Sequence, residues 1–166
     1  VQLLNSTYRI AWPEYAITAD REDAFALTNL PCQTFLLRYL LEGRQAALSL
    51  GYKTFREMPW GELYITPYTG RCLTRAAFTF GTQVANFAAA CERMGGEKLS
   101  HGDAGYGFGF LGSYRMQIMI YAGDEEFPPS SQILYSDNFA SGFSAEDRVV
   151  AGDILISAIR QEMKRK

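Results

Sequence analysis

The sequence predicts an α+β protein built as a single domain over residues 1–166. Segments that alternate like strands occur near the start of the chain and again at about 105–136, and segments with helical periodicity lie between and after them. With 166 residues, of which 48% are apolar and 20% charged, the chain has the size and composition of a globular domain. We therefore expect a largely antiparallel sheet packed against three to four helices.

The first part of the chain is predicted to supply strands and one helix. Alternation that stops at Pro13 indicates a strand, a turn and a second strand. Apolar residues at helical spacing follow Pro31, which suits a first helical turn, and Gly43 suits a helix end. The expected elements are strands at 7–12, 15–18 and 52–56 and a helix from Cys32 to Gly43.

Three further apolar stripes predict helices in the rest of the chain. The last of them follows Ser144-Ala-Glu-Asp147, which has the form of a capping box. The three stripes are residues 73–80, ended by Gly81, residues 84–91, ended by Gly95 and Gly96, and residues 150–159.

Glycine and aromatic residues alternate along 102–112. Gly107, Gly109 and Gly112 match the dinucleotide-binding pattern G-x-G-x-x-G, but that pattern requires a helix to follow. The run 114–121 alternates like a strand instead. We therefore predict a β-hairpin that turns at Gly112-Ser113, and a third strand at 132–135 completes a meander.

Counting outward from a Leu111–Tyr114 pair predicts two faces for this hairpin. It places Gly105, Gly107 and Gly109 opposite Ile120, Ile118 and Met116, and Tyr106, Phe108 and Phe110 opposite Met119, Gln117 and Arg115. The aromatic face would suit a flat ligand, with Arg and Gln fixing its orientation. The alternative is a second core layer with Arg115 at its rim. The hypothetical ligand-binding residues are Tyr106, Phe108, Phe110, Arg115, Gln117 and Tyr121, bordered by Arg56.

Residues for metal or hydrolytic chemistry are sparse. One histidine, and three cysteines (Cys32, Cys72 and Cys91) without a C-x-x-C pair, argue against zinc and cluster sites, and no G-x-S-x-G elbow accompanies the histidine. We expect no metal, and a solvated loop over the acidic run 124–126 and its prolines. A carboxylate-based site is the alternative. The candidate polar residues are Glu57, His101, Asp103, Asp124, Glu125 and Asp137.

Charge and hydropathy argue against two classes of partner. A net charge of -2 with scattered basic residues disfavours nucleic-acid binding, and no apolar run reaches the roughly 20 residues of a membrane span. No signal-peptide pattern is present, and a first residue of Val suggests a processed or trimmed chain. Together with unpaired cysteines, this predicts a cytoplasmic protein.

Several segments occur in an order that resembles the prokaryotic domain-of-unknown-function family 3786, over nearly the whole chain. They are GYKTFREMP (51–59), GGEKLSHGDA (95–104), GDEEFPP (123–129), ILYSD (133–137) and SAED (144–147). Members of that family occur mainly in anaerobic bacteria and archaea, and some carry a small iron–sulfur type of domain seen in corrinoid proteins, which this chain lacks. The resemblance implies no activity. It implies that Phe55, Arg56, Glu57, Asp103, Asp124, Glu125, Phe127, Pro128 and Asp137 occupy family-motif positions.

These observations lead to one leading hypothesis and two alternatives. The leading one is a binding or accessory module without catalysis of its own, which serves corrinoid- or iron–sulfur-linked cofactor metabolism or one-carbon metabolism. The alternatives are a small enzyme that uses the carboxylates above and a docking domain for a protein partner. The sequence identifies neither a cofactor nor an oligomeric state.

Overall fold

The computed structural model describes residues 1–42 and 44–165 and confirms the α+β class. Gly43, expected to end the first helix, lies outside the described residues. The strands are β1 (Gln2–Leu3), β2 (Ser6–Ala11), β3 (Ala16–Ala19), β4 (Tyr52–Thr54), β5 (Glu97–Leu99), β6 (Ala104–Leu111), β7 (Tyr114–Tyr121) and β8 (Ser130–Ser136). Their pairings are antiparallel throughout, in the order β3-β2-β1-β6-β7-β8-β4, with β5 also beside β6.

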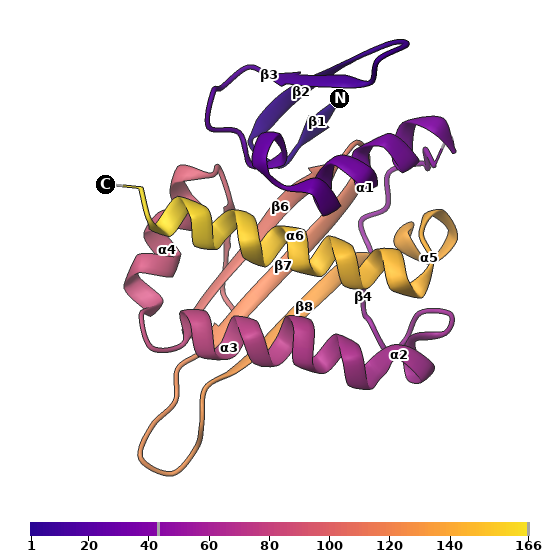
Figure 1. Ribbon diagram of the computed structural model, residues 1–166. Coiled ribbons are helices and arrows are strands. Elements are labelled where there is room, and N and C mark those ends of the chain that lie inside the picture. The colour runs from indigo at the N-terminus through magenta and orange to yellow at the C-terminus, as the bar shows by residue number, and fades with distance from the viewer. Residues whose placement is uncertain (43, 166) are drawn as a thin grey trace.

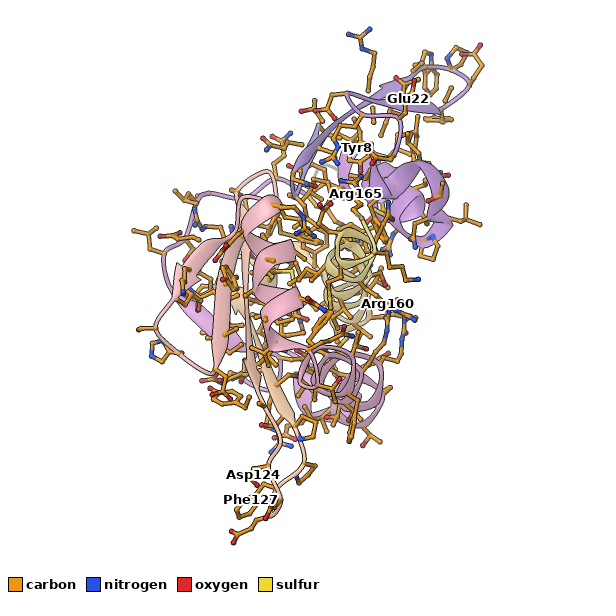
Figure 2. All side chains as sticks on the ribbon, turned by 90° about the vertical axis from the view of Figure 1, so that its left-hand side faces the viewer. Tyr8, Glu22, Asp124, Phe127, Arg160 and Arg165 are labelled. Carbon is orange, nitrogen blue, oxygen red and sulfur yellow. The ribbon has the colours of Figure 1, made fainter. Side chains whose placement is uncertain are left out.

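Helices cover one face of this sheet. They are α1 (Leu30–Leu41), α2 (Gly61–Tyr68), α3 (Arg75–Phe80), α4 (Val84–Arg93), α5 (Phe139–Gly142) and α6 (Ala145–Met163), with a 3-10 turn η1 (Phe25–Thr28) and a π-helical segment η2 (Thr69–Thr74). The long helix α6 crosses β6, β7 and β8 (Figure 1). Figure 2 shows the sheet from the side, with the helices gathered on one side of it. Within the described ranges, no helix has both the length and the apolar character that crossing a membrane would require.

The predicted helix starts are confirmed by their caps. The Asn29 side chain accepts a hydrogen bond from the Cys32 amide at 2.9 Å, which satisfies a free donor of the first turn of α1. At α6 the Ser144 hydroxyl accepts from the Asp147 amide, and the Asp147 carboxylate accepts from the Ser144 amide, so the capping box is present. Helix α2 was not predicted from the sequence. It contains Pro67, a residue that disfavours the interior of a helix.

The hairpin is confirmed, but its predicted register is wrong by one residue. Leu111 pairs with Tyr114 and Gly112 has the left-handed φ of +57° that this tight turn needs. The next pair is Gly109 with Arg115, so Phe110 is an extra residue, a β-bulge. Its carbonyl accepts a hydrogen bond from the Leu4 amide at 2.8 Å, which ties the bulge to the chain beyond β1.

Because side chains alternate along a strand, this slip exchanges the predicted partners of the two faces. Tyr106 and Phe108 pair with Ile118 and Met116, not with Met119 and Gln117. The glycines of β6 pair instead with the β7 residues that were expected opposite the aromatic residues, as Gly107 with Gln117 shows. The core therefore lies on the aromatic face of the hairpin, beneath the helices.

A cluster of charged residues joins α1 to the start of α6. The Asp147 carboxylate is buried and accepts hydrogen bonds from Arg38 and from Arg44, the latter at 2.8 Å. Both arginines also form ion pairs with Glu42. Two positive and two negative charges thus balance, and Asp147 serves the helix cap and the contact between helices at once.

Candidate functional site

The predicted aromatic binding surface is core, which corrects the hypothesis from the sequence. Tyr106, Phe108 and Phe110 are all buried. The ring of Phe87 from α4 packs edge-on against Tyr106 with centroids 5.9 Å apart, and Phe35 from α1 packs in the same way on Phe110. All three residues are at most 4% exposed, so their ring faces are not open for a flat ligand to stack on.

Arg115 and Gln117 lie on the opposite face of the sheet, away from the helices. The Arg115 guanidinium donates to the Tyr52 hydroxyl at 3.2 Å and to the Glu97 carboxylate at 3.1 Å. It therefore links β7 to strands on either side of it within the sheet, to β4 beyond β8 and to β5 beside β6. This is a structural role at a partly exposed position, and it leaves the arginine separate from the aromatic residues with which it was grouped.

The acidic candidates close turns, each with neighbours of its own. The Glu57 carboxylate accepts from the hydroxyl and the amide of Thr54, both at 2.7 Å, and these bonds lower the pKa of Glu57. The Asp103 carboxylate accepts from the Ala122 amide at 2.7 Å. Glu57 follows β4 and Asp103 precedes β6, three strand spacings away, or about 14 Å across the sheet. Glu57 and Asp103 therefore do not form a shared carboxylate pair.

The acidic run 124–126 lies in the β7–β8 loop, which extends away from the body of the protein (Figure 2). The Asp124 carboxylate accepts from the Phe127 and Glu126 amides at 2.7 and 2.9 Å, and these bonds lower the pKa of Asp124. Glu125 is exposed in the same loop. The expectation of a solvated loop with turn-forming acids is confirmed.

The last two polar candidates also lie apart. His101 is exposed in the turn before β6. Asp137 follows β8 and lies 4.0 Å from the Lys53 ammonium and 3.5 Å from the Ser49 hydroxyl. Throughout residues 1–42 and 44–165, no group of three acidic, histidine or cysteine side chains is arranged to hold a metal ion.

Arg56 and Tyr121 are the two predicted residues that the structure brings into one pocket. This edge pocket, of about 470 Å³, lies where the end of β4 meets β8 and the helical segment α2–η2. Tyr121 and the exposed Arg56 belong to its rim. Its walls are formed by Thr54, Phe55, Ile65, Tyr68, Thr69, Leu73, Ser131, Gln132 and Ile133.

Two local features create the edge pocket. Strand β4 ends at Thr54 and pairs with β8 only over 134–136, so the edge of β8 at 130–133 has no strand beside it. Opposite this edge the helix widens into the π-helical segment η2, two residues after Pro67. The Ser131 hydroxyl donates to the Leu73 carbonyl at 2.7 Å and joins β8 to η2. Such π-helical turns occur frequently at functional sites.

The inner wall of the edge pocket is aromatic. The rings of Phe55 and Tyr68 are stacked, with centroids 4.0 Å apart and planes 7° from parallel. Burial raises the pKa of Tyr68, so this phenol stays protonated over the physiological range. The wall contains no carboxylate, imidazole or thiol. It can therefore enclose an apolar group, but it supplies no obvious acid–base pair.

Comparison with protein families decides the identity of the chain at family level. The model described as Domain of unknown function (DUF3786) matches residues 1–158. The chain belongs to this family. The resemblance seen in the sequence is thus confirmed. Neither the curated proteins nor the solved structures contain a match to this DUF3786 chain.

Five of the nine motif positions implied by the DUF3786 resemblance fall into two groups in the structure. Phe55 and Arg56 line the edge pocket. Glu57, Asp103 and Asp124 accept backbone amides and shape turns. The sequence offered no signal for the pocket's apolar wall, because residues of α2 and η2 meet β8 only through tertiary packing.

Proposed function

We propose that this DUF3786 domain is a binding module that takes a flat, largely apolar small molecule in the edge pocket. The supporting observation is a pocket of about 470 Å³ with aromatic and aliphatic walls and a few polar groups, Arg56 and Gln132 among them. Ligand sites commonly have this volume and this mixture of apolar wall and sparse polar anchors. In this proposal the protein binds without catalysing a reaction, since the wall holds no carboxylate, imidazole or thiol.

The wider role in this proposal is accessory to corrinoid- or iron–sulfur-linked or one-carbon metabolism in the cytoplasm. Any iron–sulfur cluster belongs to a partner in this proposal. Cys32, Cys72 and Cys91 are buried in different helical segments, and burial raises the thiol pKa of the first two to about 12. Three unpaired thiols support a reducing compartment.

Native mass spectrometry and UV–visible titration test the binding proposal. The protein is purified without oxygen and titrated with riboflavin, haemin and cobinamide as flat probes. We expect saturable binding of at least one probe. If none of the three binds more tightly than about 1 mM, the proposed ligand class is wrong.

Two substitutions to tryptophan locate the bound probe. Leu73→Trp fills the edge pocket from η2, whereas Leu63→Trp makes the same change at an exposed position of α2 outside the pocket. We expect at least about tenfold weaker binding in the first variant and unchanged binding in the second. Thr69→Trp, at an exposed position of the pocket wall, repeats the block without overpacking the core. Equal affinity in all variants would contradict the assignment of the site.

A further inference from the structure

Arg148, in the first turn of α6, is a buried cation without a carboxylate partner. Arg148 as a whole residue is 1% exposed. One terminal nitrogen donates to the Phe143 carbonyl at 2.9 Å and the other to the Pro59 carbonyl, while Nε has no hydrogen-bond partner among the described residues. The guanidinium also lies over the Phe55 ring, 5.6 Å from its centroid. Carbonyl dipoles, a ring face and the more distant charge of Asp147 compensate the positive charge only in part, which is costly in a protein interior.

The acidic side chains around the start of α6 form their ion pairs with other arginines. The adjacent Asp147 carboxylate is engaged by Arg38, Arg44 and Ser144. Glu42 likewise forms ion pairs with Arg38 and Arg44. Among the described residues, no carboxylate forms an ion pair with Arg148. Burial accordingly lowers the pKa of its guanidinium, although an arginine remains protonated in proteins.

Arg148 is one of the residues that line a pocket of about 770 Å³, separate from the edge pocket. Pro59 and Phe143, whose carbonyls accept from Arg148, line the same pocket. Three groups of residues complete it: residues 42 and 44–46 after α1, the turn at 59–60, and the connection 140–145 from α5 into α6. We call it the Arg148 pocket.

The N-terminus of α6 opens onto this pocket. Ser144 and Ala145 lie in its wall, and α6 continues for 19 residues. The capping box satisfies the Ser144 and Asp147 amides, whereas the Ala145 and Glu146 amides have no hydrogen-bond partner in the described part of the chain. Free amides at the start of a long helix attract anions through their hydrogens and through the helix dipole. This feature and the buried cation therefore point to the same kind of ligand.

Trp60 gives the pocket a flat apolar wall. It is 70% exposed, and its backbone adopts the left-handed conformation with φ of +63°. A bulky residue rarely adopts this conformation, and such residues cluster at ligand and active sites. An exposed indole face suits a ring that stacks or packs on it.

We propose that the Arg148 pocket binds a small organic oxyanion, a carboxylate or phosphate ester that carries a flat ring. Its oxygens accept hydrogen bonds from Arg148 and from the free amides at the start of α6. Its ring lies against Trp60, and Arg44 adds a second positive charge at the wall. The site is independent of the function proposed above, because the two pockets share no residue of their walls.

Fluorescence of Trp60 reports binding directly. The chain has two tryptophans, and the other, Trp12, lies exposed between β2 and β3, so Trp12→Phe leaves a single reporter. In that background the probes are phenyl phosphate, benzoate and inorganic phosphate. We expect saturable fluorescence changes with phenyl phosphate or benzoate, and at least about tenfold weaker binding of the ring-free ion. The stronger of the two aromatic probes distinguishes a phosphate ester from a carboxylate ligand.

A pair of arginines provides the matched control. Arg38 and Arg44 both bind Asp147 and Glu42, but only Arg44 lies in the pocket wall. We expect Arg44→Met to weaken the aromatic anion several-fold and Arg38→Met to leave its affinity within about twofold. Arg148→Met removes the main partner and should cost about ten- to a hundredfold. Arg148→Lys keeps the charge but loses the planar set of donors, so we expect several-fold weaker binding, and it covers the case in which the methionine variant fails to fold.

Three results would overturn the proposal. One is the absence of saturable binding of all three probes tighter than about 1 mM. Another is an equal loss of affinity in Arg38→Met and Arg44→Met, since that indicates a general charge effect. The third is binding that persists unchanged in folded Arg148→Met or Arg148→Lys.

Discussion

Replacing Asp147 with asparagine should lower the free energy of unfolding by about 3 kcal/mol. The side chain of Asp147 is 4% exposed and takes part in the capping box of α6. Asparagine retains one oxygen, so we expect the cap to lose about 1 kcal/mol. The charged hydrogen bond to Arg44, whose side chain is 20% exposed, contributes about 2 kcal/mol more. The Arg38 side chain is 45% exposed, so its pair with Asp147 adds less.

Urea unfolding followed by far-UV circular dichroism measures this loss. With a slope near 2 kcal/mol per molar urea, the midpoint should fall by roughly 1.5 M. Asp153→Asn is the matched control, because Asp153 also pairs with two arginines, Arg71 and Arg75, but its side chain is 29% exposed. Its cost should stay below about 1 kcal/mol. If the two variants shift the midpoint equally, burial is not what makes the Asp147 cluster important.

Three other predictions concern thiols, pH and glycine. In the folded state a thiol reagent at pH 8 should leave the cysteines unmodified, because burial raises the pKa of Cys32 and Cys72 to about 12; rapid labelling without denaturant would contradict this. Burial also raises the pKa of Tyr106 to about 12. The contribution of the protonated phenol to the free energy of unfolding should therefore be complete below pH 10 and be lost as the pH rises toward 12. Urea midpoints of Tyr106→Phe should decline less steeply over this range. Finally, Gly61→Ala should destabilise, since its added Cβ meets a backbone carbonyl, whereas Gly70→Ala, with open space around it, should raise the melting temperature through up to about 1 kcal/mol of helix propensity.

Much of the fold was predictable because its signals are local. Pro31 and the apolar spacing after it located α1, and the sequence Ser144–Asp147 located the start of α6. Gly112-Ser113 located the hairpin turn. Helix α2 escaped prediction because Pro67 interrupts the pattern that favours a helix.

The hairpin faces were mispredicted because a β-bulge has no reliable sequence signal. Phe110 looks like any other residue of an alternating strand, yet its carbonyl bonds Leu4, more than 100 residues earlier. A contact at that distance along the chain fixes the register, and the register decides which face is buried. The single extra residue therefore turned a predicted binding surface into core.

The pockets depended even more on tertiary contacts. Of the residues nominated from the sequence, Arg56 and Tyr121 reached the edge pocket. Arg148 was passed over, because an arginine near an apolar helical stripe normally extends its charge into water. Its burial depends on carbonyls at positions 59 and 143, which no periodicity places beside it.

The uncovered edge of β8 has a consequence for self-association. Residues 130–133 offer backbone groups to which the strand of another chain could add, and such edges can seed aggregation. Pro128 and Pro129 directly precede this edge, and the acidic run 124–126 stands in the loop before them. Prolines lack the amide that pairing requires, and like charges repel a second copy. The loop before β8 thus limits how far an added strand can extend along this edge. We expect a shortened loop to increase self-association.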